Sequence, residues 1–389
     1  MAACDVAIVG GGAVGMAIAW KTAATGAAVN LIDPSPERGA SWAAAGMLAP
    51  VTEAHYGEEQ LLALNLASSE RWPSFAAELE DASAHPTGYR ETGTVVVARD
   101  RDDLAVLQDL STFQQDLGLT VQRLSSREVR QLEPGLAPSV RGGLLVPDDH
   151  QVDTRVLLAA LAAACRRAGV RRVNQAARGL DRRGQAVTGV KLADGETVVC
   201  EVAVLAAGAW SGRIEGLPPG SIPVRPVKGQ LLHLRGPSTY PLANGNIRGL
   251  DVYIAPRGDG RVVVGATVEE RGFDTTVTAG GVLELLRGAF ELLPGITELA
   301  LIETVAGLRP GTPDNAPLIG PGPLEGLVLA TGHYRNGILL TPVTADAVSD
   351  YLSSGRLPEH VQPFSPRRFQ HATGLTPGLP PKAAGGLGA

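Results

Sequence analysis

The sequence contains few cysteines, methionines and aromatic residues, and the shortage of cysteine limits the kinds of site it can form. Only Cys4, Cys165 and Cys200 occur in 389 residues, and no two of them form a CxxC pair. Zinc sites and disulfide frameworks need closely spaced or paired cysteines, so we predict neither, and no metal site. A sparse, odd set is typical of a reducing compartment, and we expect a cytoplasmic protein. Cys165 and Cys200 stand in apolar surroundings and are predicted to be buried.

The chain also lacks a surplus of basic residues and any long hydrophobic run. Its 34 Lys and Arg are outnumbered by 40 Asp and Glu, which gives a formal net charge of −6. Because a nucleic-acid-binding face needs excess basic side chains, we predict no nucleic-acid partner. We also predict no membrane-spanning helix, which would need about 18 consecutive apolar residues. The apolar stretch at residues 6–18 is interrupted by the glycine run at residues 10–12 and follows no basic residue, so we expect no secretory signal.

Apolar residues and glycine, by contrast, are abundant. The hydrophobic fraction of 44% and the length of 389 residues suit two or three domains, each with its own core. A short apolar strand is predicted at Asp5–Val9, a helix at Ala13–Thr25 and a second strand at Ala28–Ile32. A strand, helix and strand within about 30 residues form a βαβ unit whose strands are parallel.

The turn between this first strand and the helix carries the motif Gly10-x-Gly12-x-x-Gly15. In such a motif the glycines permit a tight turn, a close approach of pyrophosphate to the backbone, and close packing of helix on strand. The helix N-terminus then offers free N–H groups to the phosphates. Asp33 ends the second strand, where a carboxylate accepts hydrogen bonds from ribose hydroxyls. The motif alone also occurs in turns without a ligand, but its setting here predicts FAD or NAD, and the acid disfavours NADP.

Two later glycine-marked turns favour FAD over NAD. One follows a predicted strand and contains Gly208, in the stretch Leu205–Ser211. The other, Thr331–Ile338, joins a strand to a helix whose N-terminus could stabilise an anionic reduced flavin. The alternative interpretations are an ordinary strand-to-loop turn for the first and a surface loop for the second. Three widely spaced turns of this kind suit a long, folded ligand.

Several longer stretches make the chain resemble the D-amino-acid oxidase family of flavoenzymes, and within it the glycine oxidases of thiazole (thiamine) biosynthesis. The matching stretches are Val6–Gly15, Ser41–Leu48, Tyr253–Thr267, Ala306–Ile319 and Gly332–Thr341. The resemblance implies an α/β fold in which a Rossmann-like FAD-binding domain is interleaved with a mixed-sheet substrate-binding domain. We assign residues 1–86, 147–223 and 304–360 to the first domain, residues 87–146 and 224–303 to the second, and residues 365–389 to a disordered tail.

The resemblance also implies roles for individual residues. Arg309 matches an arginine that clamps the substrate carboxylate, Arg335 a second basic residue near that carboxylate, and Tyr253 a phenol that hydrogen-bonds to it. A guanidinium can bind a carboxylate through two parallel hydrogen bonds, which orient it. The alternatives are an exposed loop arginine and an aromatic residue that packs on a strand. Together with the motif glycines, the predicted FAD-binding residues are Gly10, Gly12, Ala13, Val14, Gly15, Asp33, Pro34, Ala40, Ser41, Ala45, Gly46, Met47, Gly208, His333, Tyr334, Arg335, Asn336, Gly337, Ile338 and Leu339.

Three positions depart from patterns seen in this family. Val268 stands where some glycine oxidases have methionine, and Asp251 where a histidine is seen, so the preferred amine is left open. Gly307 stands close to where sarcosine oxidases attach flavin through a cysteine, so we predict noncovalent FAD.

The implied reaction is hydride transfer from the substrate α-carbon to the flavin, followed by reoxidation by oxygen with release of hydrogen peroxide. We expect glycine or a small analogue such as sarcosine or a small D-amino acid as substrate. The imine would hydrolyse or enter thiazole synthesis. No side chain stands out as the base for the amine, and His55 and His333 rank below a water molecule. Alternatives are an amino-acid dehydrogenase that uses a quinone or carrier acceptor and a flavin-binding protein without catalysis. A homo-oligomer such as a tetramer is expected from the relatives.

Overall fold

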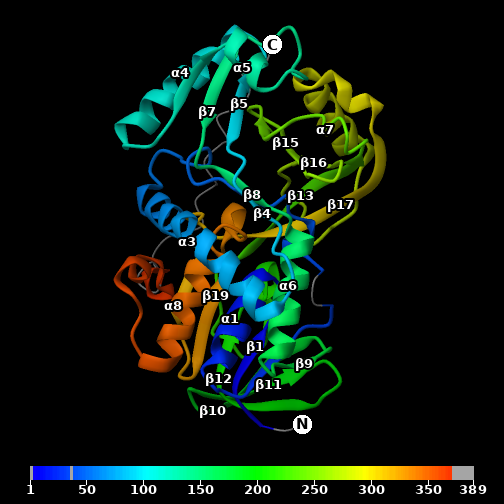
Figure 1. Ribbon diagram of the computed structural model, residues 1–389. Helices are drawn as coiled ribbons and strands as arrows, with labels where there is room; N and C mark the ends of the chain where they lie inside the picture. Colours follow the sequence, from blue (N-terminus) through cyan, green and yellow to red (C-terminus); the bar gives the residue numbers. More distant parts are fainter. Residues whose placement is uncertain (1–2, 36–37, 370–389) are drawn as a thin grey trace.

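The fold is described from a computed structural model, which describes residues 3–35 and 38–369. Figure 1 shows two large sheets, one in the lower and one in the upper half of the molecule, with helices packed on each. A small three-stranded sheet lies where the two halves meet.

The first sheet is mostly parallel and is built around the predicted βαβ unit. Its strands run in the order β10-β11-β12-β1-β2-β9, with β19 beside β12 and β18 beside β19. Strands β1, β2, β9, β12 and β19 pair in parallel, whereas β10, β11 and β18 are added antiparallel. The bounds are β1 Cys4–Val9, β2 Val29–Ile32, β9 Arg171–Val173, β10 Ala177–Arg183, β11 Ala186–Leu192, β12 Thr197–Leu205, β18 Leu318–Pro321 and β19 Leu327–Thr331.

Four helices cover this sheet. Helix α1 (Ala13–Ala24) is buried on nearly all sides and packs against α6 (Thr154–Arg167) and α8 (Thr341–Ser354), while α3 (Glu59–Ser83) packs on α6 and α8. Because α1 is enclosed, most of its side chains are small or apolar all round rather than along one stripe; Lys21 is the charged exception and forms ion pairs with Glu78 and Asp346. Helix α6 begins where the Asp153 carboxylate accepts hydrogen bonds from two backbone N–H groups of the first turn, a stabilising N-cap.

The second sheet has the strand order β17-β13-β16-β15-β14-β5-β7-β6. Helices α4 (Arg101–Asp116), α5 (Ser126–Leu132) and α7 (Ala279–Leu292) pack on it. All its pairings are antiparallel except β14 with β5. The bounds are β5 Thr94–Ala98, β6 Gln122–Ser125, β7 Gly142–Val146, β13 Arg225–Arg235, β14 Asn246–Arg248, β15 Tyr253–Pro256, β16 Arg261–Gly265 and β17 Ala300–Gly311.

Strand β17 extends further than the predicted division of the chain. The second-domain segment was expected to end at residue 303, but β17 pairs with β13 from Ala300 to Gly311. The second sheet therefore continues past this boundary, because the hydrogen bonds between the two strands hold the whole of β17 in it. As a result, Arg309 lies in the second sheet.

Short elements complete the fold and agree with the predicted class. Strands β3 (Met47–Leu48), β8 (His150–Val152) and β4 (Tyr89–Arg90) form the small sheet, and α2 (Ala40–Ala43) precedes β3. The 3-10 helices are η1 (Gly208–Arg213), η2 (Pro294–Glu298), η3 (Tyr334–Asn336), η4 (Glu359–Phe364) and η5 (Pro366–Phe369). The prediction of an α/β fold, with a Rossmann-like domain interleaved with a mixed-sheet domain, is confirmed.

The structure also bears on the expectations for the cysteines, the C-terminal segment and membrane-spanning helices. Cys165 and Cys200 are buried, as predicted. The first residues of the expected tail are ordered: η5 packs on the fold, and Arg368 forms an ion pair with Asp314. Residues 370–389 lie outside the described residues. In the described residues no helix has both the length and the apolar character needed to span a bilayer.

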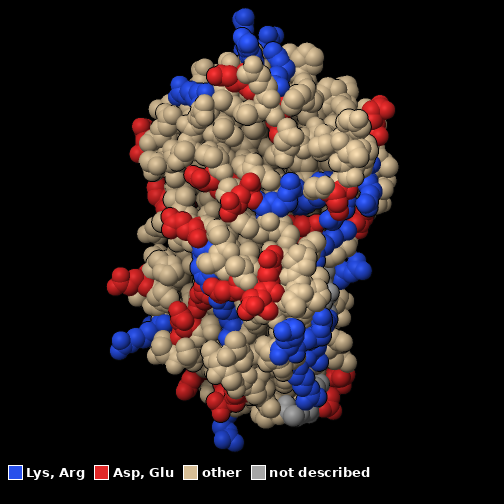
Figure 2. Space-filling view, in the orientation of Figure 1, with Lys and Arg blue, Asp and Glu red and all other residues tan. Residues whose placement is uncertain are grey.

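On the face shown in Figure 2, groups of acidic and basic side chains alternate, with one group of basic side chains at the lower right.

Candidate active site

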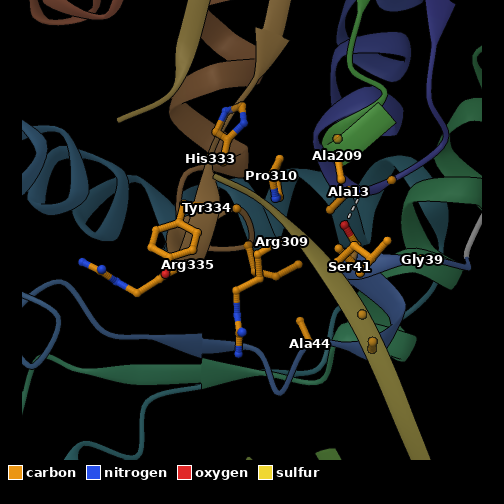
Figure 3. A pocket seen from close by; sticks show the side chains of 18 of the residues that line it. Ala13, Gly39, Ser41, Ala44, Ala209, Arg309, Pro310, His333, Tyr334 and Arg335 are labelled. Carbon is orange, nitrogen blue, oxygen red and sulfur yellow. Dashed lines mark hydrogen bonds between the residues drawn. The ribbon is translucent and has the colours of Figure 1, made fainter. Parts of the chain in front are cut away.

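A cavity of about 860 Å³ lies between the two sheets and receives residues from both. At one end it is lined by the glycine-rich turn of the first sheet, and at the other by side chains of the second sheet, including Arg309 and Tyr253. Figure 3 shows Arg309, the His333–Arg335 loop and Ser41 around this space.

The glycines of the turn after β1 have no side chains and pack directly against neighbouring backbone, which leaves room for a ligand beside the turn. A Cβ atom on Gly15 would stand 1.9 Å from the carbonyl oxygen of Gly10, and one on Gly10 would stand 2.3 Å from that of Ala206. Helix α1 has Gly12 at its N-cap, which has no side chain to cap the first turn. Apart from the N–H of Ala13, which bonds to Ser41, the N–H groups of this turn suit the pyrophosphate of a dinucleotide.

Asp33 is held in place beside this turn. Its carboxylate accepts hydrogen bonds from the backbone N–H of Gly11 at 2.6 Å and of Ser35 at 2.7 Å. Asp33 and Pro34 both line the cavity. The carboxylate is therefore fixed at the end of β2, where an adenosine ribose would lie.

The segment from Ala40 to Met47 forms one wall of the cavity. The Ser41 hydroxyl accepts a hydrogen bond from the backbone N–H of Ala13 at 3.1 Å, which ties α2 to α1 (Figure 3). The buried guanidinium of Arg257 donates hydrogen bonds to the Ala45 carbonyl and to Gln151. Burial lowers the pKa of Arg257 to about 10, so it remains charged at neutral pH. Arg257, which the sequence analysis did not single out, thus fixes this wall.

The two later glycine-marked turns lie side by side. The Thr331 hydroxyl donates a hydrogen bond to the Gly208 carbonyl at 3.1 Å and lies 2.8 Å from the Ser211 hydroxyl. Residues 333–338 line the cavity, but Leu339 does not. Its backbone carbonyl instead accepts a hydrogen bond from the Trp72 indole at 2.8 Å. The turn after β19 begins with the short helix η3, and α8 starts only at Thr341.

Arg309 projects from β17 toward the cavity as an available cation. Its Nη1 atom donates hydrogen bonds to the carbonyl oxygens of Thr267 at 3.1 Å and Lys228 at 3.4 Å. In the part of the chain that the structure describes, no acidic side chain forms an ion pair with it. A guanidinium held by neutral carbonyls keeps its charge available for an anion.

Tyr253 stands next to this cation. It faces Gly265 across the β15–β16 pairing, and a Cβ on Gly265 would stand 2.5 Å from its hydroxyl oxygen. Burial raises the pKa of the phenol above its usual value of 10, against the opposing field of Arg309. The hydroxyl therefore stays protonated and can donate a hydrogen bond to a carboxylate.

Arg335 lines the cavity, but its charge is already paired. Its Nε atom lies 2.9 Å from Glu53 and its Nη2 atom 3.0 Å from Glu58. Figure 3 shows its side chain pointing away from that of Arg309. Glu53 also forms an ion pair with Arg248, at 2.5 Å. The sequence analysis assigned no role to Glu53 or Arg248. A signal that could have indicated Arg248 was the position of this charged residue next to the apolar Ile247 in a short strand.

The two histidines of the cavity are poor bases. Burial lowers the pKa of His333 to about 3, and its Nε2 atom lies 3.0 Å from the Thr344 hydroxyl. Burial and the charge of Arg335 lower the pKa of His55. Val268 and Asp251, which depart from the family pattern, both line the cavity, and Asp251 forms an ion pair with Arg99 at 3.0 Å.

Comparison with known proteins gives a family for this architecture. The family model described as FAD dependent oxidoreductase matches residues 5–351. The chain belongs to this family, and FAD is its cofactor. The glycine-rich turn, Asp33 and the wall at Ala40–Met47 fit this cofactor.

Individual relatives are similar over most of the chain. The glycine oxidase of Geobacillus kaustophilus is 35% identical over 95% of this chain and 98% of its own length. A crystal structure of glycine oxidase from that organism superposes with a TM-score of 0.87 at 34% identity, covering 94% of this chain and 98% of the other. The bifunctional protein ThiO/ThiG of Synechocystis is 36% identical over 95% of this chain. The chain spans about half the length of such bifunctional relatives, 54% in that case.

Proposed function

We propose that this protein oxidises glycine, or a small analogue such as sarcosine or a small D-amino acid, to the corresponding imine. FAD, held by the glycine-rich turn, Asp33 and the wall at Ala40–Met47, would supply the two-electron acceptor, and oxygen would be the final acceptor with hydrogen peroxide as the product. The single observation that carries the proposal is the available guanidinium of Arg309 beside the Tyr253 phenol, in the cavity that also holds the FAD-binding turn. The similarity to glycine oxidases over nearly the whole chain supports it.

In this proposal Arg309 and Tyr253 bind the substrate carboxylate. Arg309 supplies the positive charge and the phenol a further hydrogen bond, so the carboxylate is fixed at two points. The α-carbon next to it is then held in one orientation, and such positioning is what a hydride transfer needs most from the protein. The predicted FAD-binding residues that line the cavity shape the cofactor site. FAD binding is noncovalent in this proposal, because Gly307 stands close to the position where a cysteine would attach the flavin.

The substrate amine must lose its proton before the reaction. His333 and His55 both have lowered pKa values, and Glu53, with a pKa of about 2, is too weak a base. We therefore propose that water entering with the substrate accepts the proton of the substrate amine. The imine hydrolyses to glyoxylate and ammonia, or serves thiazole formation for thiamine, as the ThiO/ThiG relatives suggest. A cytoplasmic homo-oligomer remains part of the proposal.

The experiment that tests the proposal compares the purified holoenzyme before and after glycine. We expect the flavin absorbance near 450 nm to bleach under anaerobic conditions, and addition of air to restore it with one peroxide per glycine oxidised. Bleaching without reoxidation by air would favour the dehydrogenase alternative, in which a quinone restores the colour. No bleaching by glycine, sarcosine or D-alanine would contradict the proposal.

A further inference from the structure

Near the proposed substrate carboxylate the cavity is lined by three guanidinium groups, those of Arg309, Arg248 and Arg335, although an amino-acid substrate with one carboxylate needs one. Arg309 has no acidic partner in the described residues, whereas Arg248 and Arg335 share the carboxylate of Glu53. Glu53 Oε1 accepts a hydrogen bond from Arg248 Nη1 at 2.5 Å, and Oε2 lies 2.9 Å from Arg335 Nε. Glu53 therefore bridges one cation on β14 of the second sheet and another in η3, which follows β19 of the first sheet.

The bridging carboxylate is buried and stays ionised. The Glu53 side chain is 14% exposed, and those of Arg248 and Arg335 are 20% and 24% exposed. Burial alone would raise the pKa of Glu53, but the two guanidinium groups outweigh this effect and hold the pKa at about 2. Glu53 is thus an anion at every pH at which the enzyme would work.

The bridge lies beside the position proposed for the substrate carboxylate. Arg248 on β14 is the register partner of Tyr253 on β15, and Glu53 and Arg248 both act electrostatically on the Tyr253 phenol. All three members of the bridge line the cavity. A substituent on the substrate amine or α-carbon that reaches this side of the cavity would therefore meet the bridge.

We propose that Arg248 and Arg335 form a second carboxylate subsite and that Glu53 fills this subsite as an internal anion. The enzyme therefore discriminates against substrates that carry a second carboxylate. This inference rests on the proposed function and deepens it. Two guanidinium groups would bind a free carboxylate strongly, but both already form ion pairs with Glu53. An incoming second carboxylate would gain no cation and would face a like charge.

The charges around the bridge agree with a preference for zwitterions. Arg309, Arg248 and Arg335 carry three positive charges. Glu53, Glu58 and the buried Asp149, which acts electrostatically on Arg248, carry three negative charges when ionised. A substrate with one ammonium and one carboxylate leaves this balance unchanged, whereas one with two carboxylates adds a negative charge. Removal of the Glu53 charge would leave a positive surplus.

The variant Glu53→Gln tests the inference with two secondary amines that differ in one carboxylate. Sarcosine carries an N-methyl group and iminodiacetate an N-carboxymethyl group. We expect the ratio of kcat/KM for iminodiacetate to kcat/KM for sarcosine to rise at least about tenfold in the variant, since one uncompensated charge contact is worth more than about 1.4 kcal/mol. An unchanged ratio would overturn the inference.

Two further variants separate charge from general damage. Glu58→Gln removes the other partner of Arg335, but Glu58 does not line the cavity, so the ratio should stay at the wild-type value. Adding Arg248→Met to Glu53→Gln removes half of the vacated subsite and should cancel most of the gain. If the gain persists in the double variant, its cause is the added space and not the anion subsite, and the inference is contradicted.

A binding measurement keeps this inference separate from the reaction itself. Malonate and acetate, which carry two carboxylates and one, are titrated against the holoenzyme while the flavin spectrum and the melting temperature are recorded. Malonate should gain affinity relative to acetate in Glu53→Gln only. This outcome would stand even if the wild-type protein failed to oxidise glycine, and equal gains for both ligands would contradict the inference.

Discussion

The guanidinium of Arg309 lies directly against the backbone of Gly229, where no side chain intervenes. A Cβ atom on Gly229 would stand 2.5 Å from Nη1 and 2.6 Å from Cζ of Arg309. Gly229 belongs to β13 and Arg309 to the neighbouring strand β17, so the absence of one side chain sets where the cation stands. In the same way, the position of the Tyr253 phenol depends on the absence of a side chain at Gly265.

The variant Gly229→Ala should therefore displace the guanidinium without touching the FAD site. We expect kcat/KM for glycine to fall about 10–100-fold, because shifts of about 1 Å in a positioning group have effects of this size. Steady-state kinetics and the flavin spectrum measure the two properties separately. Gly280→Ala is the matched control, since a Cβ there meets no other atom within 4 Å and should leave kcat/KM unchanged.

Removal of the cation itself should have a larger effect. In Arg309→Met we expect kcat/KM for glycine to fall by a factor that corresponds to about 2–5 kcal/mol, with a strongly raised KM. Arg309→Lys should recover only part of this loss because an ammonium lacks the planar two-point geometry. FAD content should match that of the wild type. Kinetics equal to the wild type in the Met variant would rule out the clamp; Arg235→Met, at the exposed end of β13, is the control.

The Tyr253→Phe variant tests the phenol. We expect kcat/KM to fall about 10–100-fold, the effect of losing one hydrogen bond to a charged group. Because burial raises the pKa of this phenol above 10, its proton stays in place up to that pH. The wild-type to variant ratio of kcat/KM should thus be constant from pH 7 to pH 10. A ratio that falls toward one within this range would show that the phenol ionises and would contradict the assignment.

The variant Gly15→Ala should lose FAD. A Cβ atom would stand 1.9 Å from the Gly10 carbonyl oxygen, so either the turn or α1 must move away from the phosphate position. We expect purified protein with little absorbance at 450 nm and a Kd for FAD raised at least about tenfold, or about 1.4 kcal/mol. Gly280→Ala changes a helical glycine whose Cβ position is open, and this variant should stay yellow. Full retention of FAD by the Gly15 variant would contradict the geometry of the turn.

Asp149 gives a prediction for stability as a function of pH. Its carboxylate accepts hydrogen bonds from the backbone N–H groups of Val51 and Thr52, but burial raises its pKa to about 6. The folded state therefore binds this proton more tightly than the unfolded state, so the stabilising contribution of protonated Asp149 is lost as the pH rises from about 4 to about 6. The loss is about 3 kcal/mol at most.

The variant Asp149→Asn should be less stable than the wild type at pH 4, because its amide accepts fewer hydrogen bonds. The gap in melting temperature should narrow as the pH is raised to 7, since only the wild type loses stability through this group. Melting curves at pH 4, 5, 6 and 7 measure the gap. A gap that widens with pH would mean that ionised Asp149 stabilises the fold.

Much of the cofactor site could be predicted from the sequence because its signals are local. The glycines at positions 10, 12 and 15 and the acid at position 33 lie in one βαβ unit, whose strand and helix patterns are visible within about 30 residues. The prediction that three glycine-marked turns share one ligand agrees with the hydrogen bond between Thr331 and Gly208. Leu339 was assigned with its neighbours but lies outside the cavity, because its carbonyl is turned to Trp72.

The pairing of charges was decided only by the tertiary structure. Arg335 resembled a residue that binds the substrate carboxylate, yet it is paired with Glu53 and Glu58, and Glu53 also pairs with Arg248, 195 positions away in the chain. An ion pair depends on distance and burial, which a sequence pattern does not contain. By itself, the sequence determined the nucleotide-binding unit, the mixed-sheet companion domain and a cation at position 309. Packing of the two sheets decided which cation is available and which are neutralised, since only the folded chain brings these side chains within hydrogen-bonding distance.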